Sequence, residues 1–379
     1  MACQLKDRDI PANLHCEDLQ DLLVTTETSQ ELGDTIIQMI ETASKHIYII
    51  NPLIYDARLT RAITNARNRR VRVKLITNLR KRTGDKATYP TKGFDATNKK
   101  QLHEQYRAPR ALAEHGVLCK ETLFSPHAKL FIADSQSAII CSANGNSNSL
   151  GWGNEVSIEA GMKITDKDVL TEVLQGWAAL WQQCPFTLHN LDGTFTLEES
   201  NRSKSVAWPL SQSSHDRLFW SVPTQIHSLL DTITKKVNAA KNDIIFVVFS
   251  FYDLDKMVDL NNALLSALER GVRVRVVVRP DVHALTKFPD PNTIMLMRQG
   301  LEVLAYPGMH AKGLVIDDTY CGIFSANINP YSLSSDLDSA NVEIGYFEDC
   351  HSNSMHEFAR WIRYIADSAP HQIIDVAKS

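Results

Sequence analysis

The hydrophobic and polar positions of this chain follow one pattern twice. Between His46 and Asn78, an apolar strand is followed by apolar residues at helical spacing, and then by a strand in which apolar and basic residues alternate. The stretch from Asp243 to Arg279 has the same order. The apolar residues of the alternating strands are Val71, Val73 and Leu75 in the first copy and Val272, Val274 and Val276 in the second. An internal repeat of this length predicts two halves with the same fold.

Strands alternate with helices in both copies, and this order predicts the fold class. We expect an α/β fold of two pseudo-symmetric lobes, each with a mixed β-sheet and helices packed on its faces. The lobes are predicted over residues 30–185 and 223–379, and residues 1–29 are expected to form an N-terminal extension. Residues 186–222 are rich in Ser, Thr and Asn and sustain no hydrophobic period, so we expect a linker there.

Five polar residues recur at the same positions of both halves. They are His127, Lys129, Asp134, Ser142 and Asn144 in the first half and His310, Lys312, Asp317, Ser325 and Asn327 in the second, with 183 positions between the members of every pair. Residues two apart on a strand point to the same face, so an imidazole and an ammonium group can converge on one phosphate. A strand alongside would bring the Asn amide to the same place. The two halves together therefore predict a single phosphate site with two copies of each group.

The two HxKx4D and SxN patterns resemble those of the phospholipase D superfamily, whose pattern is HxKx4Dx6GSxN. Cys141 and Phe324 stand where that pattern has Gly. The resemblance implies a phospholipase D-like fold and a metal-independent phosphodiesterase that works through a phosphohistidine and needs no cofactor.

The resemblance also implies a role for each repeated residue. By analogy with the order common in the superfamily, His127 is assigned as the nucleophile and His310 as the acid that protonates the leaving oxygen. The phosphoryl oxygens would be held by Lys129, Lys312, Asn144 and Asn327. Glu155 and Glu343 are expected to orient the two imidazoles, with Asp338 competing for the second position. Structural or orienting roles are expected for Asp134, Asp317, Ser142 and Ser325.

Basic residues are concentrated in one part of the first half. The chain has a net charge of −4, but 16 Lys and Arg and only 3 Asp and Glu lie between Arg58 and Arg110. The interval from Val73 to His127 is also 18 residues longer than the matching interval from Val274 to His310. Such a segment, with aromatic residues interleaved, suits a nucleic acid. The expected nucleic-acid contacts are Arg80, Lys81, Arg82, Lys86, Lys92, Lys99, Lys100, Arg107 and Arg110.

We therefore expect a nuclease acting on DNA or RNA. The sequence around His127 also resembles the nuclease branch found in bacterial restriction and defence proteins. One alternative is a phospholipase D or phosphatidyl transferase acting on phospholipids, and another is a non-catalytic nucleic-acid-binding protein. The basic segment has a simpler explanation too, as a solvated loop whose charge aids solubility. A nuclease in the cytosol needs restraint, so a regulatory protein partner is a further expectation.

Other classes of protein find no support in the sequence. The longest apolar run, over residues 244–251, is too short to cross a bilayer, and residues 1–14 lack the order of a secretory signal, so we expect a cytoplasmic protein. Seven scattered cysteines without a CxxC pair argue against a zinc site or a disulfide framework. No HExxH, Walker, GxGxxG or GxSxG motif occurs, and no metal site is predicted.

Overall fold

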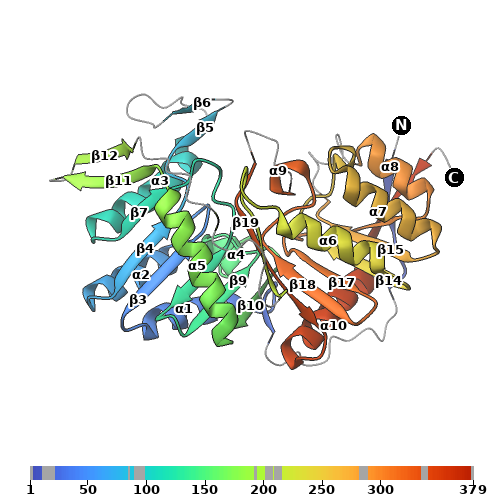
Figure 1. The fold of residues 1–379 in the computed structure, drawn as a ribbon, viewed down its shortest axis with the longest axis horizontal. Coiled ribbons are helices and arrows are strands. Elements are labelled where there is room, and N and C mark those ends of the chain that lie inside the picture. Colours follow the sequence, from blue (N-terminus) through green and yellow to red (C-terminus); the bar gives the residue numbers. More distant parts are fainter. Residues whose placement is uncertain are drawn as a thin grey trace.

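Each half of the repeat forms a lobe around a nine-stranded sheet, and the two lobes lie side by side (Figure 1). The computed structural model describes residues 3–10, 22–83, 86–88, 99–191, 194–200, 208, 216–280, 289–333 and 340–376. Both sheets are mixed, as the sequence predicts. Three central strands are parallel in each lobe and the remaining pairings are antiparallel.

The sheet of the first lobe has the order β12-β11-β7-β4-β3-β8-β9-β10-β2. Its strands are β2 (Leu23–Thr25), β3 (His46–Ile50), β4 (Arg72–Ile76), β7 (Leu118–Glu121), β8 (Leu130–Ala133), β9 (Ser137–Cys141), β10 (Glu159–Ile164), β11 (Phe186–Leu191) and β12 (Thr194–Glu199). The helices are α1 (Glu31–Thr42), α2 (Ala57–Asn68), α3 (Lys99–Glu114), α4 (Ser147–Leu150) and α5 (Lys167–Gln183). A separate small hairpin consists of β5 (Lys81–Thr83) and β6 (Lys86–Thr88).

The sheet of the second lobe repeats this arrangement in the order β1-β20-β16-β15-β14-β17-β18-β19-β13. Its strands are β1 (Cys3–Asp7), β13 (Leu218–Ser221), β14 (Asp243–Val247), β15 (Arg273–Val278), β16 (Glu302–Ala305), β17 (Gly313–Ile316), β18 (Tyr320–Phe324), β19 (Glu343–Asp349) and β20 (His371–Asp375). The helices are α6 (Ser228–Ala239), α7 (Val258–Glu269), α8 (Pro291–Arg298), α9 (Pro330–Leu333) and α10 (Asn353–Ser368), with the 3-10 helix η2 (Leu254–Lys256) before α7.

Two of the expected boundaries differ in the structure. Residues 1–29 are not a separate extension, because β1 pairs with β20 at the edge of the second sheet and β2 pairs with β10 at the edge of the first. Residues 186–222 are not only a linker, because β11 and β12 extend the first sheet and β13 extends the second. The backbone hydrogen bonds of these short strands are satisfied by the sheet edges that they cover.

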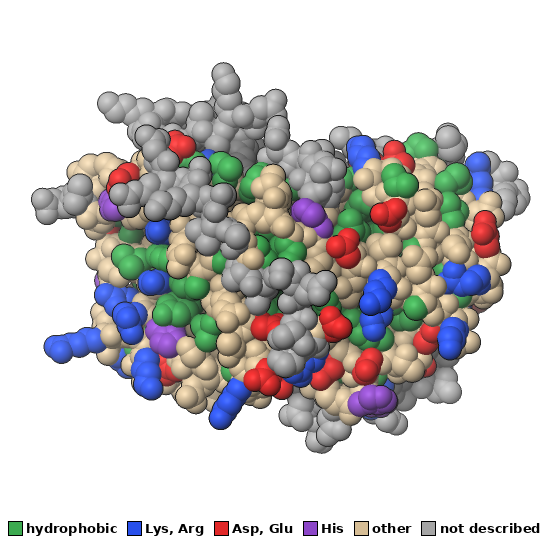
Figure 2. Space-filling model, in the orientation of Figure 1, with side chains coloured by type: hydrophobic (Ala, Val, Ile, Leu, Met, Phe, Trp, Pro, Cys, Tyr) green, Lys and Arg blue, Asp and Glu red, His purple; other side chains and the backbone are tan. Residues whose placement is uncertain are grey.

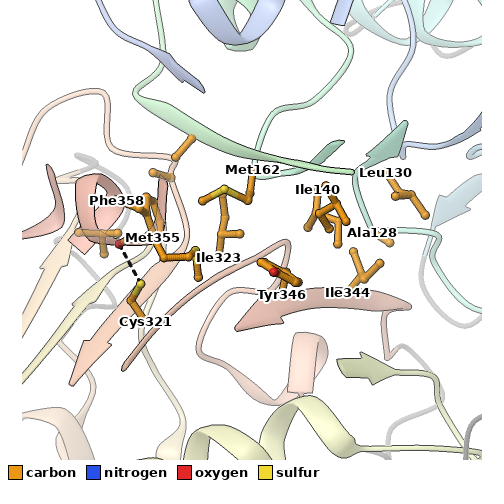
Figure 3. Close-up of a cluster of buried hydrophobic side chains, with 14 of the residues drawn as sticks. Ala128, Leu130, Ile140, Met162, Cys321, Ile323, Ile344, Tyr346, Met355 and Phe358 are labelled. Atoms are coloured by element: carbon orange, nitrogen blue, oxygen red, sulfur yellow. Dashed lines mark hydrogen bonds between the residues drawn. The ribbon is translucent and has the colours of Figure 1, made fainter. Parts of the chain in front are cut away.

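Apolar side chains fill three cores. One lies between the first sheet and the pair α1 and α2, and a second lies between the second sheet and the pair α6 and α7. The third includes α5, α10 and facing strands of both lobes. Figure 3 shows part of this shared core, where Ile140 and Met162 of the first lobe lie close to Ile323, Ile344 and Tyr346 of the second. Because the apolar surface between the lobes is buried, the two lobes are held together as one folded unit.

Among the described residues, no helix combines the length and the apolar character that a membrane crossing requires.

Candidate active site

His127 and His310 lie where the two lobes meet, just before β8 and β17. Backbone hydrogen bonds between the lobes fix both positions. Ala128 N donates to Val342 O at 2.6 Å, and His310 N donates to Ile158 O at 3.0 Å. Each histidine is thus held by the backbone of the opposite lobe as well as by its own strand.

The two histidines are also paired crosswise with buried glutamates. His127 Nδ1 donates to Glu343 Oε1 and His310 Nδ1 donates to Glu159 Oε1, both at 2.7 Å. Both glutamate side chains are fully buried. An ionised carboxylate only accepts hydrogen bonds, so each imidazole must carry its proton on Nδ1 and leave Nε2 free for chemistry.

A serine holds the other oxygen of each carboxylate. Ser142 Oγ donates to Glu159 Oε2, and Ser325 Oγ donates to Glu343 Oε2, both at 2.5 Å. Asn341 Nδ2 makes an additional, longer contact of 3.4 Å with Glu343 Oε1. Burial raises the pKa of each glutamate, but the nearby histidine, lysine and serine outweigh burial and lower it below the ordinary value. Both carboxylates are therefore ionised at neutral pH.

The predicted partner of a catalytic histidine, Glu155, does not have this role, because His310 is paired with Glu159 instead. Glu155 is exposed in the loop before β10, whereas Glu159 is the first residue of that strand and points into the site. A local signal distinguishes the two, because Glu159 and Glu343 are each followed two residues later by a glycine, at Gly161 and Gly345. Asp338, the competitor of Glu343, lies outside the described residues.

Two buried lysines lie behind the histidines. Lys129 Nζ donates to His127 O at 2.7 Å and to His127 Nε2 at 2.9 Å, and Lys312 Nζ donates to His310 O at 2.6 Å. Neither lysine side chain is exposed. Burial lowers the pKa of Lys129 to about 7 and that of Lys312 to about 8, although the glutamates act in the opposite direction. The negative charge of a bound phosphate would favour the charged ammonium form of both lysines.

The imidazoles are the part of this cluster that solvent reaches. The side chain of His127 is 21% exposed and that of His310 is 15% exposed. Burial lowers the pKa of both histidines, that of His310 to about 4, against the opposing effect of the paired glutamates. Both imidazoles are therefore neutral at pH 7, as a nitrogen nucleophile must be.

Asn144 and Asn327 follow the serines in the two halves, and their side-chain oxygens are buried. Among the described residues, neither Oδ1 atom has a hydrogen-bond partner. Buried amide oxygens are rarely left unpaired, and unpaired ones often mark a place that a ligand or water fills.

Asp134 and Asp317 lie away from the histidines, at the far ends of β8 and β17. The Asp134 carboxylate accepts hydrogen bonds from the backbone N of Ser44, Lys45 and His46 at 2.7–2.9 Å. Asp317 accepts the corresponding bonds from Lys241, Asn242 and Asp243. Both residues have φ of 52°, a left-handed conformation that Asp tolerates in tight turns. Through these bonds, Asp134 connects the β8–β9 hairpin to the start of β3, and Asp317 connects the β17–β18 hairpin to the start of β14.

Arg80, expected to contact nucleic acid, is buried and committed to the fold. Its guanidinium forms an ion pair with Glu121 at 3.2 Å and lies over the Phe186 ring at 3.5 Å. Arg80 lies beyond the end of β4, where its guanidinium reaches Glu121, the last residue of β7. Arg107 is exposed, and Arg110 lies over the Phe195 ring at 5.8 Å. Lys92 is outside the described residues, and the side chains of Lys81, Arg82, Lys86, Lys99 and Lys100 are not described.

Other basic side chains gather on the first lobe. Figure 2 shows Lys and Arg concentrated at its lower left, and Asp and Glu more numerous along the lower middle. Exposed Arg58 and Arg61 lie on the first turns of α2, near the loop that carries Asn144, because Asp56 N donates to Gly145 O. Arg72 starts β4 beside His46, at the end of the lobe opposite to the histidine pair. The basic surface is thus divided between the two ends of the lobe.

A family model described as "Cardiolipin synthase, PLD-like domain" matches residues 36–181 and 233–364. These two segments correspond to the two lobes and contain both histidines. No curated protein matches the sequence.

Solved structures resemble the fold at low sequence identity. Phosphatidylserine synthase from Haemophilus influenzae Rd KW20 is 13% identical with a TM-score of 0.63, over 94% of this chain and 88% of that one. Polyphosphate kinase from Porphyromonas gingivalis is 12% identical with a TM-score of 0.52, over 86% of this chain. The match spans only 47% of that kinase. The phospholipase D family member Nuc from Salmonella typhimurium is 16% identical with a TM-score of 0.32, over 42% of this chain and 96% of that one.

Proposed function

Because this chain belongs to the phospholipase D superfamily, whose members transform phosphodiesters, we propose that it cleaves a phosphodiester through a phosphohistidine. The observation that carries the proposal is the crosswise arrangement of His127 with Glu343 and His310 with Glu159. It gives two imidazoles of fixed tautomer, with two buried lysines beside them. Such a set can attack phosphorus, protonate a leaving oxygen and hold the phosphoryl charge.

In the proposed reaction, Nε2 of His127 attacks phosphorus while the bond to the leaving oxygen breaks. The assignment of His127 follows the order common in the superfamily, and Nε2 of both histidines is unprotonated because each Nδ1 donates to a glutamate. The leaving oxygen takes its proton from Nε2 of His310. This proton is present once an anionic substrate raises the pKa of that imidazole. His310 then removes a proton from water, which attacks the phosphohistidine and releases His127.

The mechanism is tested by trapping the intermediate. His310→Asn removes the acid but keeps the nucleophile, so a chromogenic phosphodiester with a good leaving group should phosphorylate the variant and stall it. Mass spectrometry of the intact protein should detect the adduct, and peptide mapping should place it on His127. His127→Asn should form no adduct. His371→Asn is a matched control at the surface, where that residue pairs with Asp7. An adduct on His310 would reverse the assignment, and active His127→Asn protein would refute the mechanism.

For the substrate, we propose DNA or RNA. The support is the excess of basic residues between Arg58 and Arg110, and the exposure of Arg58, Arg61 and Arg107 in that segment. Single- and double-stranded DNA and RNA should be cleaved by the purified protein in the presence of EDTA, with activity lost in His127→Ala.

A phosphatidyl transfer or phospholipase reaction is the second candidate, because the description of the matching family model names cardiolipin synthase. The same assay distinguishes the two when phospholipid vesicles are included. Turnover of vesicles alone, again lost in His127→Ala, would replace the nuclease proposal and leave the phosphohistidine mechanism intact.

A further inference from the structure

One aromatic ring in the second lobe lies next to three cationic or ionisable groups of the site. The Phe249 ring meets the His310 ring edge to face, with the centroids 5.2 Å apart and the planes at 65°. Lys312 Nζ and Arg279 Cζ each lie 6.0 Å from the centre of the Phe249 ring. Phe249 therefore bridges the proposed acid of the reaction and an arginine that the mechanism does not use.

The sheet fixes Phe249 and Arg279 at the edge that carries His310. One residue, Val248, separates Phe249 from the end of β14, and Val248 N donates to Val277 O at 3.0 Å. Arg279 directly follows β15. These are the carboxyl ends of two parallel strands. Since Val247 at the end of β14 pairs with Gly313 at the start of β17, the same edge carries His310. Both side chains are partly exposed.

Arg279 differs from the two arginines within β15. Arg273 pairs with Glu302 at 2.7 Å, and Arg275 pairs with Asp367 at 2.7 Å. For Arg279, the contact with Phe249 is its one interaction with the described part of the chain. A partly buried guanidinium that has no carboxylate partner among the described residues is suited to bind an anion, because its fork of N–H donors matches phosphate oxygens.

The first lobe has no equivalent of this pair. The backbone register places Pro52 at the position of Phe249 and Asn78 at that of Arg279, since Asn51 N donates to Ile76 O as Val248 N does to Val277 O. In the proposed reaction, the groups that occur in both lobes act on the phosphorus between the two histidines. A group present in one lobe can serve only one of the two unlike sides of the phosphodiester. Beside His310, that side is the leaving group.

We propose that Phe249 and Arg279 form a subsite for the phosphate that follows the reacting one on the leaving-group side of a nucleic-acid strand. Arg279 binds the oxygens of this flanking phosphate, and the Phe249 ring packs against the sugar or base between the two phosphates. This inference rests on the proposed nuclease function and deepens it. It makes the enzyme prefer strands over isolated phosphodiesters.

The test compares dinucleotides that differ by one terminal phosphate. The unphosphorylated dinucleotide dTpdT has only the reacting phosphodiester, and pdTpdT and dTpdTp add a flanking phosphate on either side. The unaltered protein should cleave one phosphorylated form with a lower KM than dTpdT. Arg279→Gln should lower kcat/KM for that form by about 10- to 100-fold, through KM, because it removes hydrogen bonds to a charged group. Its effect on dTpdT should stay within about 2-fold, the range of a site that holds no contact with that substrate.

Three further variants sharpen the result. Arg279→Lys should keep part of the preference, since it retains charge without the fork. Phe249→Leu should raise KM for all three dinucleotides, because each has a base or sugar on the leaving side. Arg273→Gln, at the other end of β15, should behave as the unaltered protein, because its exposed ion pair with Glu302 lies away from the histidines. Thermal unfolding of each variant checks that the fold is kept.

Several results would overturn the subsite. Equal losses on all three dinucleotides in Arg279→Gln would show that Arg279 acts on the reacting phosphate, and equal activity with the unaltered protein would show that it binds nothing. If the unaltered protein cleaves no nucleotide, the nuclease proposal itself fails. A selective loss on cardiolipin vesicles would then reassign Arg279 to a lipid phosphate and end the nucleic-acid subsite.

Discussion

The Nδ1 atom of His127 donates a 2.7 Å hydrogen bond to Oε1 of Glu343, a residue that lies in the opposite lobe. His310 and Glu159 repeat the relationship in the other direction. Neither lobe therefore contains a complete histidine and carboxylate pair of its own. Any motion that separates the lobes breaks both pairs at once.

Replacement of either glutamate should impair catalysis far more than folding. In Glu343→Gln or Glu159→Gln, the amide can donate to Nδ1 and stabilise the tautomer that carries its proton on Nε2. We expect kcat to fall by about 10²- to 10⁴-fold, as when the carboxylate of a catalytic triad is replaced by an amide. Steady-state kinetics on a chromogenic phosphodiester measures the effect. Glu155→Gln is the matched control, because Glu155 is exposed; a similar loss there would contradict the assignment of Glu159.

The rate should depend on pH with a maximum below neutrality or close to it. The pKa values of Lys129 and Lys312 are lowered to about 7 and about 8, so both ammonium groups are charged below these values and lose their charge as the pH rises through them. His127 must be neutral to attack phosphorus. Its pKa is lowered from the ordinary value of 6.5, so the activity should rise with pH in the range below 6.5, as His127 loses its proton. A profile of kcat/KM, which reports the free enzyme, should be bell-shaped. Activity that stays constant up to pH 9 would contradict the role of the lysines.

Asp134 should contribute to stability and little to catalysis. Burial raises its pKa, but the hydrogen bonds from Ser44, Lys45 and His46 lower it to about 2. Its contribution is therefore fully present above the unfolded pKa near 3.8, and it is lost as the pH falls toward 2. We expect Asp134→Ala to lower the free energy of unfolding by about 2–4 kcal/mol, since several hydrogen bonds to a partly exposed carboxylate are lost.

Urea unfolding at pH 7 and pH 3 measures this contribution, and the difference between Asp134→Ala and the unaltered protein should shrink at pH 3. Asp34→Ala, on the exposed side of α1, is the control and should change the free energy of unfolding by less than about 0.5 kcal/mol. A loss of kcat without a loss of stability in Asp134→Ala would place this carboxylate in the reaction instead.

The shared core predicts that the lobes unfold together. Ile140 is fully buried on β9 and belongs to the core that joins the lobes. We expect Ile140→Ala to lower the free energy of unfolding by about 2–5 kcal/mol while the transition stays single. Calorimetry checks both points. Ile63→Ala, equally buried but in the core of α1 and α2, is the matched control and should have a similar effect on stability. Two separate transitions would show that the lobes are independent.

The repeat and the central strands could be predicted from sequence because their signals are local. Alternating strands and the histidine, lysine and serine spacings each occupy a few consecutive residues, and the structure places the two sets at matching positions of the two sheets. The role of Glu343 could also be predicted, since Glu343 begins the strand that follows Ser325. Its counterpart Glu159 does not follow from the repeat, because the intervening loop differs by one residue and shifts the spacing from 183 to 184.

Features that depend on distant partners could not be predicted. Strand β1 has the short sequence CQLKD, in which every residue after Cys3 is exposed, and its partner β20 lies at the other end of the described chain. The basic neighbours of Arg80 in the sequence predict a nucleic-acid contact at this residue. Its burial depends on Glu121 and Phe186, which a local pattern does not connect to it. The crosswise pairing itself depends on how the lobes dock.

The pairing of β1 with β20 has a consequence for how the protein is made. During synthesis, β1 leaves the ribosome long before β20, so the first lobe can complete its sheet while the second still lacks its outer edge. Until β20 arrives, β16 presents unpaired backbone groups to other nascent chains. β20 covers that edge and then receives β1, whose ladder joins Cys3 to Asp375. Two strands that are far apart in the order of synthesis thus close the same sheet, and a ribosome-bound chain that stops before residue 371 should aggregate more readily than one that includes β20.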